Sequence, residues 1–595
     1  MSLEYQPPLR DMVFVIDEWI GAPEWWSTVS AWKDLDRVIV QQVLDEAARF
    51  VTERIAPLNS SGDLQGCGFS NGEVTLPYGF RDAYQAFAQA GWPTLAVDSE
   101  AGGQGLPQLI DAALQEMLAA ANHAWLMSPG LTHGAIACLA AHGSERLKRD
   151  LLPRIVSGEW LTTMCLTEPQ AGSDLSRLRA RATYDSQCDG YRINGNKIFV
   201  SGGDHDLTDN IVHLVLARLP DAPAGTKGLS LFVVPKWFVD DEGVRIRNEV
   251  HCDGVEKKMG LKASPTCSMR FEEALGWIVG EPNRGLAAMF VMMNAARLQV
   301  AMQGLGHAQI ASQRAEIYAR ERAQMRAVSA PPGVTSELGR PDPISFHPAI
   351  RRILLDLRAT TEGERAIGYW IGYWLDVAER HQDATERSAA VKLASLLTPI
   401  AKAFFTENGF SAASRALQVF GGYGYIHEYG VEQIVRDSRV AMIYEGTNEI
   451  QAIDLLVRKV LADGGEALGI LLKQCRAEAS RGHAVKNSAV KRACLKLESL
   501  IADVSRVTDS IVSESIADSE LAYRVADDYL GMLGWFLLAF AWTRSLRLAS
   551  EEGREDAFYA EKRTTAEYFF DYPIAAFGHR RTLVEAGIRK KLPHV

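Results

Sequence analysis

The sequence predicts an α+β protein in which helical segments stand on both sides of a small β domain. From residue 34 to about residue 158, apolar side chains recur at helical spacing. Near residue 161 the period shortens to that of strands, and from about residue 285 helical spacing returns and continues to the C-terminus. A chain of 595 residues is too long for one compact domain, so several domains are expected.

The composition is that of an ordinary soluble globular protein, with 47% hydrophobic and 23% charged residues. A net charge of −11 argues against a nucleic-acid partner. The eight cysteines form no CxxC pair, which favours a reducing compartment over a disulfide framework or a zinc site. No signal peptide is visible, and the longest apolar run, residues 529–542, is too short to span a bilayer. We therefore expect a cytoplasmic protein with no metal site and no integral membrane segment.

We expect five consecutive parts along the chain. They are an aromatic-rich leader (1–35), a helical domain (36–160), a β domain (161–282), a second helical domain (283–462) and an additional C-terminal helical domain (463–595). The leader carries four tryptophans, which should pack onto the body of the protein or onto a second subunit. The many prolines and glycines of residues 326–345 predict a loop or lid-like insertion.

Local patterns place the individual elements. In the first helical domain we predict helices at residues 38–51, 84–90, 109–121 and 134–139, with a glycine-rich turn at 101–105. In the β domain, Asn194-Gly195 stands between alternating apolar residues, a pattern typical of a β-hairpin. Further strands are predicted at 211–217, 229–234, 244–248, 267–271 and 277–279, which together indicate an antiparallel barrel or sandwich.

One carboxylate, Glu445, follows a short apolar run and precedes a Gly-Thr turn and a new helix. Asn448 and Gln451 have the spacing of a capping pair for that helix. Apolar surroundings raise the pKa of a carboxylate, and nearby backbone N–H groups hold it in place, which suits a general base in a dry pocket. Taken alone, a glutamate at a helix start is more often a cap or a solvated charge.

Seven motifs in order give residues 40–460 a resemblance to the acyl-CoA dehydrogenase family. They are TEPQAGSD at 167–174, INGNKIFVS at 193–201, EKKMGLKAS at 256–264, NAAR at 294–297, YARER at 318–322, QVFGGYG at 418–424 and YEGT at 444–447. The leader and the C-terminal domain are most similar to the longer bacterial branch of that family, which includes 3-methylmercaptopropionyl-CoA dehydrogenases.

The resemblance implies both the fold and the reaction. The fold has an N-terminal helical domain, a middle antiparallel β-barrel or sandwich and a C-terminal four-helix bundle, here with an additional C-terminal helical domain. The reaction is the FAD-dependent α,β-dehydrogenation of an acyl-CoA thioester to trans-2-enoyl-CoA, as in fatty-acid β-oxidation. Glu445 would remove the α proton and N5 of FAD would take the β hydride. Some relatives place the base just before the arginine matching Arg297, but Ala296 stands there and cannot serve.

The resemblance also assigns binding residues. The positions expected to contact FAD are Met164, Leu166, Thr167, Gly172, Ser173, Phe199, Ser201, Arg322, Gln418, Gly421, Gly422 and Thr447. Those expected to contact the substrate are Ser173, Asn294, Arg297, Tyr444 and Gly446. A guanidinium suits a diphosphate and a Gly-Gly pair permits close backbone approach, although Gly-Gly is also an ordinary helix end. Taken alone, the hydroxyls of Thr167 and Ser201 are ordinary turn hydroxyls.

Two positions depart from the family pattern. Serine stands at 201 where threonine is usual, and Asn294 stands where several relatives have aspartate, which weakens the expected contact with CoA. Arg297 lies among apolar residues, so we expect it to be buried, to need a partner and to lie near the catalytic turn.

The family passes electrons to an electron-transferring flavoprotein, which is the expected partner. We also expect a homodimer, because an extra helical domain often covers the surface used for a second pairing. A medium- or long-chain acyl-CoA is the expected substrate. The alternatives are a 3-methylmercaptopropionyl-CoA dehydrogenase or an acyl-CoA oxidase. The non-enzyme alternative is a DNA-binding flavoprotein of the same fold, which the negative charge and Glu445 argue against. The aromatic segment 369–374 could wall the acyl pocket or form a domain or subunit seam.

Overall fold

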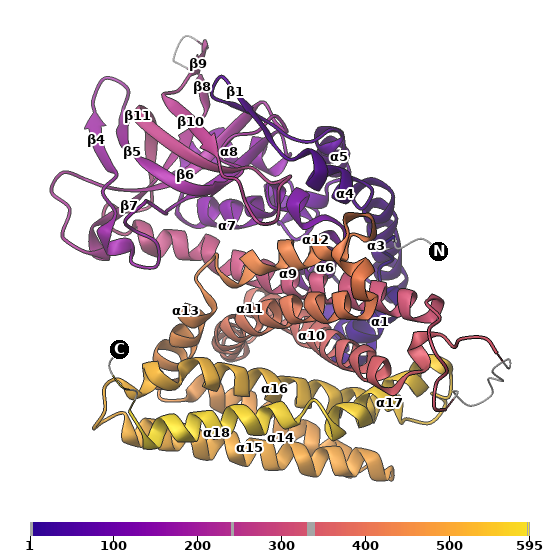
Figure 1. The fold of residues 1–595 in the computed structure, drawn as a ribbon. Helices are drawn as coiled ribbons and strands as arrows, with labels where there is room; N and C mark the ends of the chain where they lie inside the picture. The colour runs from indigo at the N-terminus through magenta and orange to yellow at the C-terminus, as the bar shows by residue number, and fades with distance from the viewer. Residues whose placement is uncertain (1–3, 240–242, 330–338, 592, 594–595) are drawn as a thin grey trace. The chain divides into compact units, whose positions relative to one another are not determined.

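The computed structural model describes residues 4–239, 243–329, 339–591 and 593 (Figure 1). The chain divides into two compact units. The first, here called the helical unit, comprises Met1–Ala48, Pro107–Ala120 and Val300–Val595, and the second, the barrel unit, comprises Arg49–Leu106 and Ala121–Gln299. Three helices have residues in both units, namely α3 (Arg37–Phe50), α6 (Gln108–Leu126) and α9 (Gly285–Glu321).

A seven-stranded sheet closed on itself forms the centre of the barrel unit. Its strands are β3 (Trp160–Cys165), β4 (Arg181–Asp185), β5 (Gly190–Ser201), β6 (Asn210–Arg218), β7 (Leu229–Pro235), β10 (Val250–Val255) and β11 (Thr266–Val279). The pairings β11–β5, β5–β4, β4–β6, β6–β7 and β7–β11 complete a circuit, so the sheet is a barrel. Most pairs are antiparallel, but β3 runs parallel to β6, a departure from the predicted all-antiparallel sheet.

The structure contains the other predicted strands, with two differences. The runs 267–271 and 277–279 are parts of one strand, β11. The run 244–248 contains β9 (Arg245–Arg247), which pairs with β8 (Trp237–Val239) in a separate two-stranded sheet. A further small hairpin joins β1 (Gly68–Ser70) to β2 (Glu73–Thr75).

The predicted hairpin at Asn194-Gly195 is wrong, because β5 runs unbroken from Gly190 to Ser201. A Cβ at position 195 would lie 2.7 Å from the Cβ of Ala180, so the glycine allows close packing between neighbouring segments. The Asn194 side chain accepts a hydrogen bond from the backbone N–H of Glu273 at 2.9 Å, next to a register shift between β5 and β11. The Asn-Gly pair therefore marks an irregularity within a long strand.

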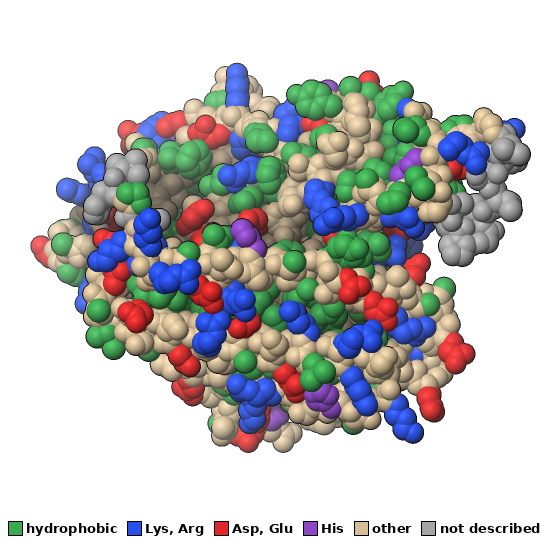
Figure 2. Space-filling view, turned by 60° about the horizontal axis from the view of Figure 1, so that its bottom comes forward, with side chains coloured by type: hydrophobic (Ala, Val, Ile, Leu, Met, Phe, Trp, Pro, Cys, Tyr) green, Lys and Arg blue, Asp and Glu red, His purple; other side chains and the backbone are tan. Residues whose placement is uncertain are grey.

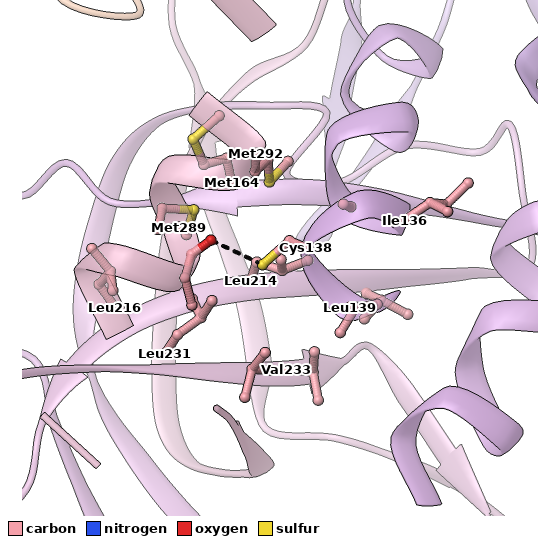
Figure 3. Close-up of a cluster of buried hydrophobic side chains, with 14 of the residues drawn as sticks. Ile136, Cys138, Leu139, Met164, Leu214, Leu216, Leu231, Val233, Met289 and Met292 are labelled. Atoms are coloured by element: carbon pink, nitrogen blue, oxygen red, sulfur yellow. Dashed lines mark hydrogen bonds between the residues drawn. The ribbon is translucent and has the colours of Figure 1, made fainter. Parts of the chain in front are cut away.

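Apolar side chains of the barrel pack against helices of the same unit. These helices are α7 (Thr132–His142) and α8 (Glu145–Val156), together with the first turns of α9, and the unit also contains α4 (Leu58–Gln65) and α5 (Phe80–Gln89). Figure 3 shows Leu214, Leu231 and Val233 of the sheet facing Leu139 of α7 and Met289 of α9. The thiol of Cys138 donates to the carbonyl of Ala288 at 3.3 Å, which links α7 to α9. This core fixes the strand ends from which several predicted flavin contacts project.

Helices of different lengths build the other unit. They are α10 (Pro348–Arg380), α11 (Ala384–Phe420), α12 (Val431–Ser438), α13 (Asn448–Ile453), α14 (Glu466–His483), α15 (Ser488–Glu514), α16 (Leu521–Ala549), α17 (Ala557–Asp571) and α18 (Ala575–Arg589). The helices α10 and α11 pack together, and both contact α16 of the C-terminal extension. A Cβ at Gly304 of α9 would lie 2.6 Å from the backbone of Phe405, so the glycine lets α9 and α11 cross closely. The α+β class with helices before and after a β-barrel, and with further C-terminal helices, is thus confirmed.

The leader packs onto the body of its own chain. Its helices are α1 (Leu9–Val13), the following turns Phe14–Ile20 and α2 (Ala22–Trp26). Trp19 is fully buried and donates its indole N–H to the carbonyl of Ala541 at 3.1 Å. Trp19 also lies edge-on to Trp370 of α10, with ring centroids 6.2 Å apart. Of the two roles considered for the aromatic segment 369–374, the seam is therefore the one that the contacts support.

A buried cluster of charges connects the leader to the rest of the helical unit. Arg365 of α10 pairs with Glu116 of α6, with 2.6 Å between nitrogen and oxygen, and with Asp11 of the leader. Asp11 also pairs with Lys562 of α17, which in turn pairs with Glu362 at 2.7 Å. Burial alone raises the pKa of Asp11, but Lys562 and Arg365 outweigh burial and leave the pKa below its ordinary value.

The remaining features concern surfaces and insertions. By length and composition, α9 and residues 384–425 could each cross a membrane, but 56% and 78% of their most apolar windows are buried, as in core helices. Among the described residues, no group of three or more histidine, cysteine or carboxylate side chains could hold a metal ion. Acidic and basic side chains are interspersed over the face shown in Figure 2. The predicted insertion lies partly outside the described residues, at 330–338, while its flanks are joined where buried Asp342 accepts from the N–H of Ala327 at 2.7 Å.

Candidate functional site

Glu445 lies in a tight turn that ends at α13 of the helical unit. Its backbone φ is +54°, in the left-handed region, and Gly446 follows with φ of +83°. A residue with a side chain rarely adopts this conformation, which costs about 1–3 kcal/mol and persists only where neighbours enforce it. A Cβ at Gly446 would lie 2.8 Å from Nε2 of Gln451, so the glycine is needed for space as well as for its backbone angle. The turn therefore presents the half-buried Glu445 in a fixed, strained conformation.

Buried side chains hold this turn from three sides. The amide of Gln451 donates to the carbonyl of Glu445 at 2.9 Å, and the ammonium of Lys402 donates to the carbonyl of Gly446 at 2.7 Å. The hydroxyl of Tyr444 donates to the side-chain oxygen of Gln303 on α9. Burial, followed by the charge of Glu445, raises the pKa of Tyr444 well above its ordinary value, so this hydroxyl keeps its proton at neutral pH.

The predicted capping pair of Asn448 and Gln451 is wrong. The N-cap of α13 is Thr447, whose hydroxyl accepts from the N–H of Ile450 at 3.4 Å. Asn448 is buried, and its side-chain oxygen accepts from Lys402 at 3.1 Å. Gln451 turns its amide to the carbonyl of Glu445. Asn448 therefore bonds to α11 and Gln451 bonds to the turn. Both side chains are buried, so they bond to these polar partners instead of capping the helix.

A pocket of about 600 Å³ lies in the helical unit at the end of α11. Its lining includes Arg322, Gly421 and Gly422, three of the predicted FAD contacts, but not the exposed Gln418. Gly421 has φ of +61°, and a Cβ at either glycine would meet open space. The pair thus ends the helix and also exposes backbone to the pocket.

The chemistry of this pocket fits the adenosine diphosphate half of FAD. Aromatic rings line it, with Tyr318 stacked on Phe420 at 4.1 Å between centroids, and such faces suit a flat heteroaromatic base. The guanidinium of Arg322 lies 5.3 Å from the ring of Tyr423, and the described residues offer it no carboxylate partner. A guanidinium without an ion pair suits a diphosphate. Tyr318 and Phe420 were not predicted as contacts, although both stand inside the recognised motifs.

The barrel unit carries the other predicted flavin contacts. Met164 is buried and Leu166 is half-buried, and both pack against the hydrophobic core at the end of β3. Thr167 and Ser201 are half-buried, and among the residues that the structure describes neither hydroxyl has a hydrogen-bond partner. Phe199 has φ of +57° and is 61% exposed. Hydroxyls that remain available beside an exposed ring fit the edge of an isoalloxazine.

The loop after Thr167 is held by a buried ion pair that the sequence analysis did not identify. Glu168 and Lys197 lie 2.9 Å apart, and Glu168 also accepts the backbone N–H groups of Arg179 and Ala180. Burial raises the pKa of Glu168, but Lys197 and these N–H groups outweigh burial and leave the pKa lowered. Gly172 and Ser173 of this loop are exposed, and a Cβ at Gly172 would meet nothing. Lys197 lies inside a recognised motif, but its partner stands 29 residues away.

Arg297 is 6% exposed, as its apolar surroundings predict, and donates to the side chain of exposed Asn294 at 3.4 Å. Both residues belong to the barrel unit, together with 164–201. Tyr444, Glu445, Gly446, Thr447, Arg322, Gln418, Gly421 and Gly422 belong to the helical unit. That the two sets form one site, with Arg297 near the catalytic turn, stays a prediction.

Family models match nearly the whole chain. They describe the N-terminal domain of acyl-CoA dehydrogenases at residues 40–159, the middle domain at 163–274, the C-terminal domain at 283–460, and an acetyl-CoA dehydrogenase C-terminal-like domain at 471–591. The chain therefore belongs to the acyl-CoA dehydrogenase family. As a member of this family it is an FAD-dependent oxidoreductase of acyl-CoA thioesters.

Individual relatives extend over the same length. A 3-methylmercaptopropionyl-CoA dehydrogenase of Ruegeria pomeroyi is 42% identical, covering 95% of each chain. The broad-specificity linear acyl-CoA dehydrogenase FadE5 of Mycobacterium tuberculosis is 32% identical, covering 98% of this chain and 97% of its own. The crystal structure of Caenorhabditis elegans ACDH-11 in complex with C11-CoA has the same fold, with a TM-score of 0.76 at 19% identity over 96% of this chain and 92% of its own.

Proposed function

We propose that this enzyme dehydrogenates a short acyl-CoA carrying a thioether, 3-methylmercaptopropionyl-CoA, with Glu445 as the base. The observation that carries the proposal is the 42% identity, over 95% of both chains, to the Ruegeria pomeroyi enzyme of that name. This similarity favours the short thioether substrate over the medium- or long-chain acyl-CoA expected from the sequence. At this coverage the similarity includes most of the additional C-terminal helices, residues 463–595.

The chemical task explains the turn that carries Glu445. A proton α to a thioester is only weakly acidic, so the base must be aimed at it and water must be kept away. Glu445 would take the α proton as the Cα–Cβ double bond forms, and the strained turn fixes the direction of its carboxylate. FAD, when bound, accepts the β hydrogen with its electron pair. Asn294, Arg297, Tyr444, Gly446 and Ser173 are the proposed substrate contacts.

We propose the cofactor contacts from the side chains and backbone groups that each location offers. Arg322, Gly421 and Gly422 would hold the diphosphate and adenosine, since they line a pocket that offers a guanidinium, aromatic faces and accessible backbone. Thr167 and Ser201 would donate to the flavin ring from the barrel unit. The backbone of Met164, Leu166, Gly172 and Thr447, and the side chains of Phe199, Ser173 and Gln418, complete the proposed set.

We further propose a cytoplasmic homodimer that passes its electrons to an electron-transferring flavoprotein. An exposed group of apolar side chains beside the Arg322 pocket supports a subunit interface, because such groups mark contact surfaces. Tyr425 is 82% exposed, and Tyr423 and Ile426 are each 42% exposed. Analytical ultracentrifugation tests the dimer, and a tetramer would contradict it.

A second candidate is a dehydrogenase of broad specificity for linear acyl-CoA. The similarity to the Mycobacterium tuberculosis enzyme, 32% over almost the full chain, favours it. The same fold could also serve an acyl-CoA oxidase, in which oxygen reoxidises the flavin. Two substrates that differ at one position of the acyl chain separate these two dehydrogenase candidates. Pentanoyl-CoA is 3-methylmercaptopropionyl-CoA with the sulfur replaced by a methylene.

That pair of substrates makes the test direct. The holoenzyme is mixed anaerobically with 3-methylmercaptopropionyl-CoA, pentanoyl-CoA, butyryl-CoA, octanoyl-CoA or palmitoyl-CoA, and bleaching of the flavin absorbance is followed in time. We expect the thioether to reduce the flavin at least about tenfold more efficiently than pentanoyl-CoA, a discrimination that one group in a pocket can supply. Equal rates for the two would support the broad-specificity enzyme, and a preference for octanoyl- or palmitoyl-CoA would refute the thioether proposal. Rapid reoxidation by dissolved oxygen would indicate an oxidase.

A further inference from the structure

A lysine side chain is fully buried directly behind the turn that carries Glu445. Lys402 stands in the middle of α11, and its side chain has no exposed surface. Its ammonium donates to the carbonyl of Gly446 at 2.7 Å and to the side-chain oxygen of Asn448 at 3.1 Å. Removing an ammonium group from water costs several kcal/mol, so a buried lysine is kept only where its hydrogen bonds are good. The ammonium of Lys402 thus stabilises the backbone of the turn through the carbonyl of Gly446.

A second buried donor faces the same turn. Gln451 of α13 is fully buried, and its amide donates to the carbonyl of Glu445 at 2.9 Å and to that of Gly446 at 3.4 Å. The carbonyls of Glu445 and Gly446 therefore both point to buried donors, one from α11 and one from α13. Fixing two successive carbonyls fixes the two peptide planes that flank Gly446, and the first of these planes includes the Cα of Glu445, so it restricts the direction of the Cα–Cβ bond of Glu445.

Asn448 extends the network around Lys402. Its oxygen accepts from Lys402, and its amide donates to the carbonyl of Ala403 at 3.1 Å. The hydroxyl of Thr406, one turn further along α11, lies 3.3 Å from the same oxygen. The start of α13 is thus fastened to α11 by side chains that are all buried, and a satisfied polar network of this kind rigidifies what it holds.

We propose that Lys402 and Gln451 are positioning residues that hold Glu445 in its left-handed conformation and so aim its carboxylate at the substrate. The proposal rests on the proposed role of Glu445 as the base. Neither side chain is assigned a contact with substrate or flavin. Their action is on the backbone of the turn, which without them would relax toward an ordinary, right-handed conformation and move the carboxylate.

The expected consequence is a loss of rate with little loss of binding. A displacement of about 1 Å between base and proton costs about 10²-fold in rate. We therefore expect Lys402→Met, which replaces the ammonium by a group of similar length, to slow anaerobic flavin reduction about 10²-fold. We expect Gln451→Leu to slow it about tenfold or more. The amount of bound flavin should stay within about twofold, and the Kd for acyl-CoA should change much less than the rate, because neither side chain is itself a proposed contact and they reach the substrate set only through the carbonyl of Gly446.

The matched control is Lys459→Met. Lys459 is half-buried and also bonds to α11, with its ammonium 2.6 Å from the hydroxyl of Ser395, and within the described part of the chain it makes no hydrogen bond to the turn. This variant should keep the wild-type rate. The double variant Lys402→Met with Gln451→Leu should lose less than the product of the two single losses, since both side chains donate to the carbonyl of Gly446.

The experiment measures three quantities for each full-length holoenzyme: flavin per chain, acyl-CoA affinity, and the rate of flavin reduction at saturating 3-methylmercaptopropionyl-CoA and at saturating butyryl-CoA. If Lys402→Met and Gln451→Leu both bind flavin and reduce it within twofold of wild type, the positioning proposal is refuted. If either variant fails to fold, the other decides the matter alone, with Gln451→Asn as a milder third variant. A loss of flavin or of acyl-CoA affinity that accounts for the whole rate loss also contradicts the proposal.

Glu445→Gln separates this proposal from the assignment of the base. If Glu445→Gln retains most of the wild-type reduction rate, the base itself is wrong and the positioning proposal falls with it. If Glu445→Gln abolishes reduction while Lys402→Met leaves it unchanged, only the positioning proposal is refuted.

Discussion

The buried charge cluster around Arg365 makes a prediction about stability that can be worked out partner by partner. In the native structure Arg365 neutralises both Asp11 of the leader and Glu116 of α6, and Lys562 supplies a second cation to Asp11. Breaking a buried ion pair by removing one partner costs about 3–5 kcal/mol, because the other charge stays buried without compensation. The size of the loss within that range depends on which partners remain around the buried charge.

The variants Asp11→Ala and Arg365→Met leave different partners around the buried charges. After Asp11→Ala, Arg365 still has Glu116 and Lys562 still has Glu362, so we expect a loss near the lower end, about 3 kcal/mol. After Arg365→Met, Asp11 keeps its ion pair with Lys562. Glu116 loses its cation and is left with the hydrogen bond from the hydroxyl of Tyr369. We therefore expect the larger loss, about 5 kcal/mol, for Arg365→Met.

Differential scanning calorimetry of the holoenzyme measures the effect, with Glu24→Ala as a control from an exposed position of the same leader. The first unfolding transition should fall by several degrees for Asp11→Ala and further for Arg365→Met, whereas Glu24→Ala should leave it unchanged. A transition of Asp11→Ala that coincides with that of Glu24→Ala would refute the reasoning. So would a smaller effect of Arg365→Met than of Asp11→Ala.

Three further predictions concern catalysis, the cofactor and pH. Glu445→Gln should reduce turnover at least about 10²-fold while flavin stays bound, because it removes a general base, and turnover with unchanged flavin absorbance measures this. Arg322→Ala should weaken flavin binding about 10- to 100-fold through loss of charge-assisted hydrogen bonds, as measured by flavin retention on dialysis, with Arg322→Lys intermediate. The lowered pKa of Glu168 means that its pair with Lys197 contributes stability above the ordinary carboxyl pKa of 4.5 and loses it as pH falls through the folded value. The Tm difference between wild type and Glu168→Gln should therefore shrink from pH 7 toward pH 3, and a constant difference would contradict the assignment.

Much of the architecture could be predicted because periodicity is local. Strands β6 and β7 are mostly apolar runs and match the predicted strands within one or two residues, since buried strands need apolar side chains on both faces. The burial of Arg297 followed from the apolar residues around it on its own helix. The family motifs then supplied the order of domains and the position of Glu445.

The errors have a common physical cause, which is that partners distant in the chain decide what a local signal means. Asn194-Gly195 has the composition of a turn, but Ala180 and Glu273 use the pair to fit a long strand. Asn448 and Gln451 have the spacing of a cap, but a lysine 46 residues earlier takes the oxygen of Asn448. No spacing rule could reveal that pairing, because it depends on α11 lying behind the turn.

The bond between the indole of Trp19 and the carbonyl of Ala541 joins positions 522 residues apart. At about 5–20 residues per second, a ribosome needs roughly half a minute to two minutes to reach the second partner after making the first. Throughout that interval the ring of Trp19 has no α16 to cover it, and Asp11 has no Lys562. The leader is therefore synthesised long before its partners in α16 and α17, so nascent chains of this protein carry an exposed, tryptophan-rich segment that holdase chaperones would recognise.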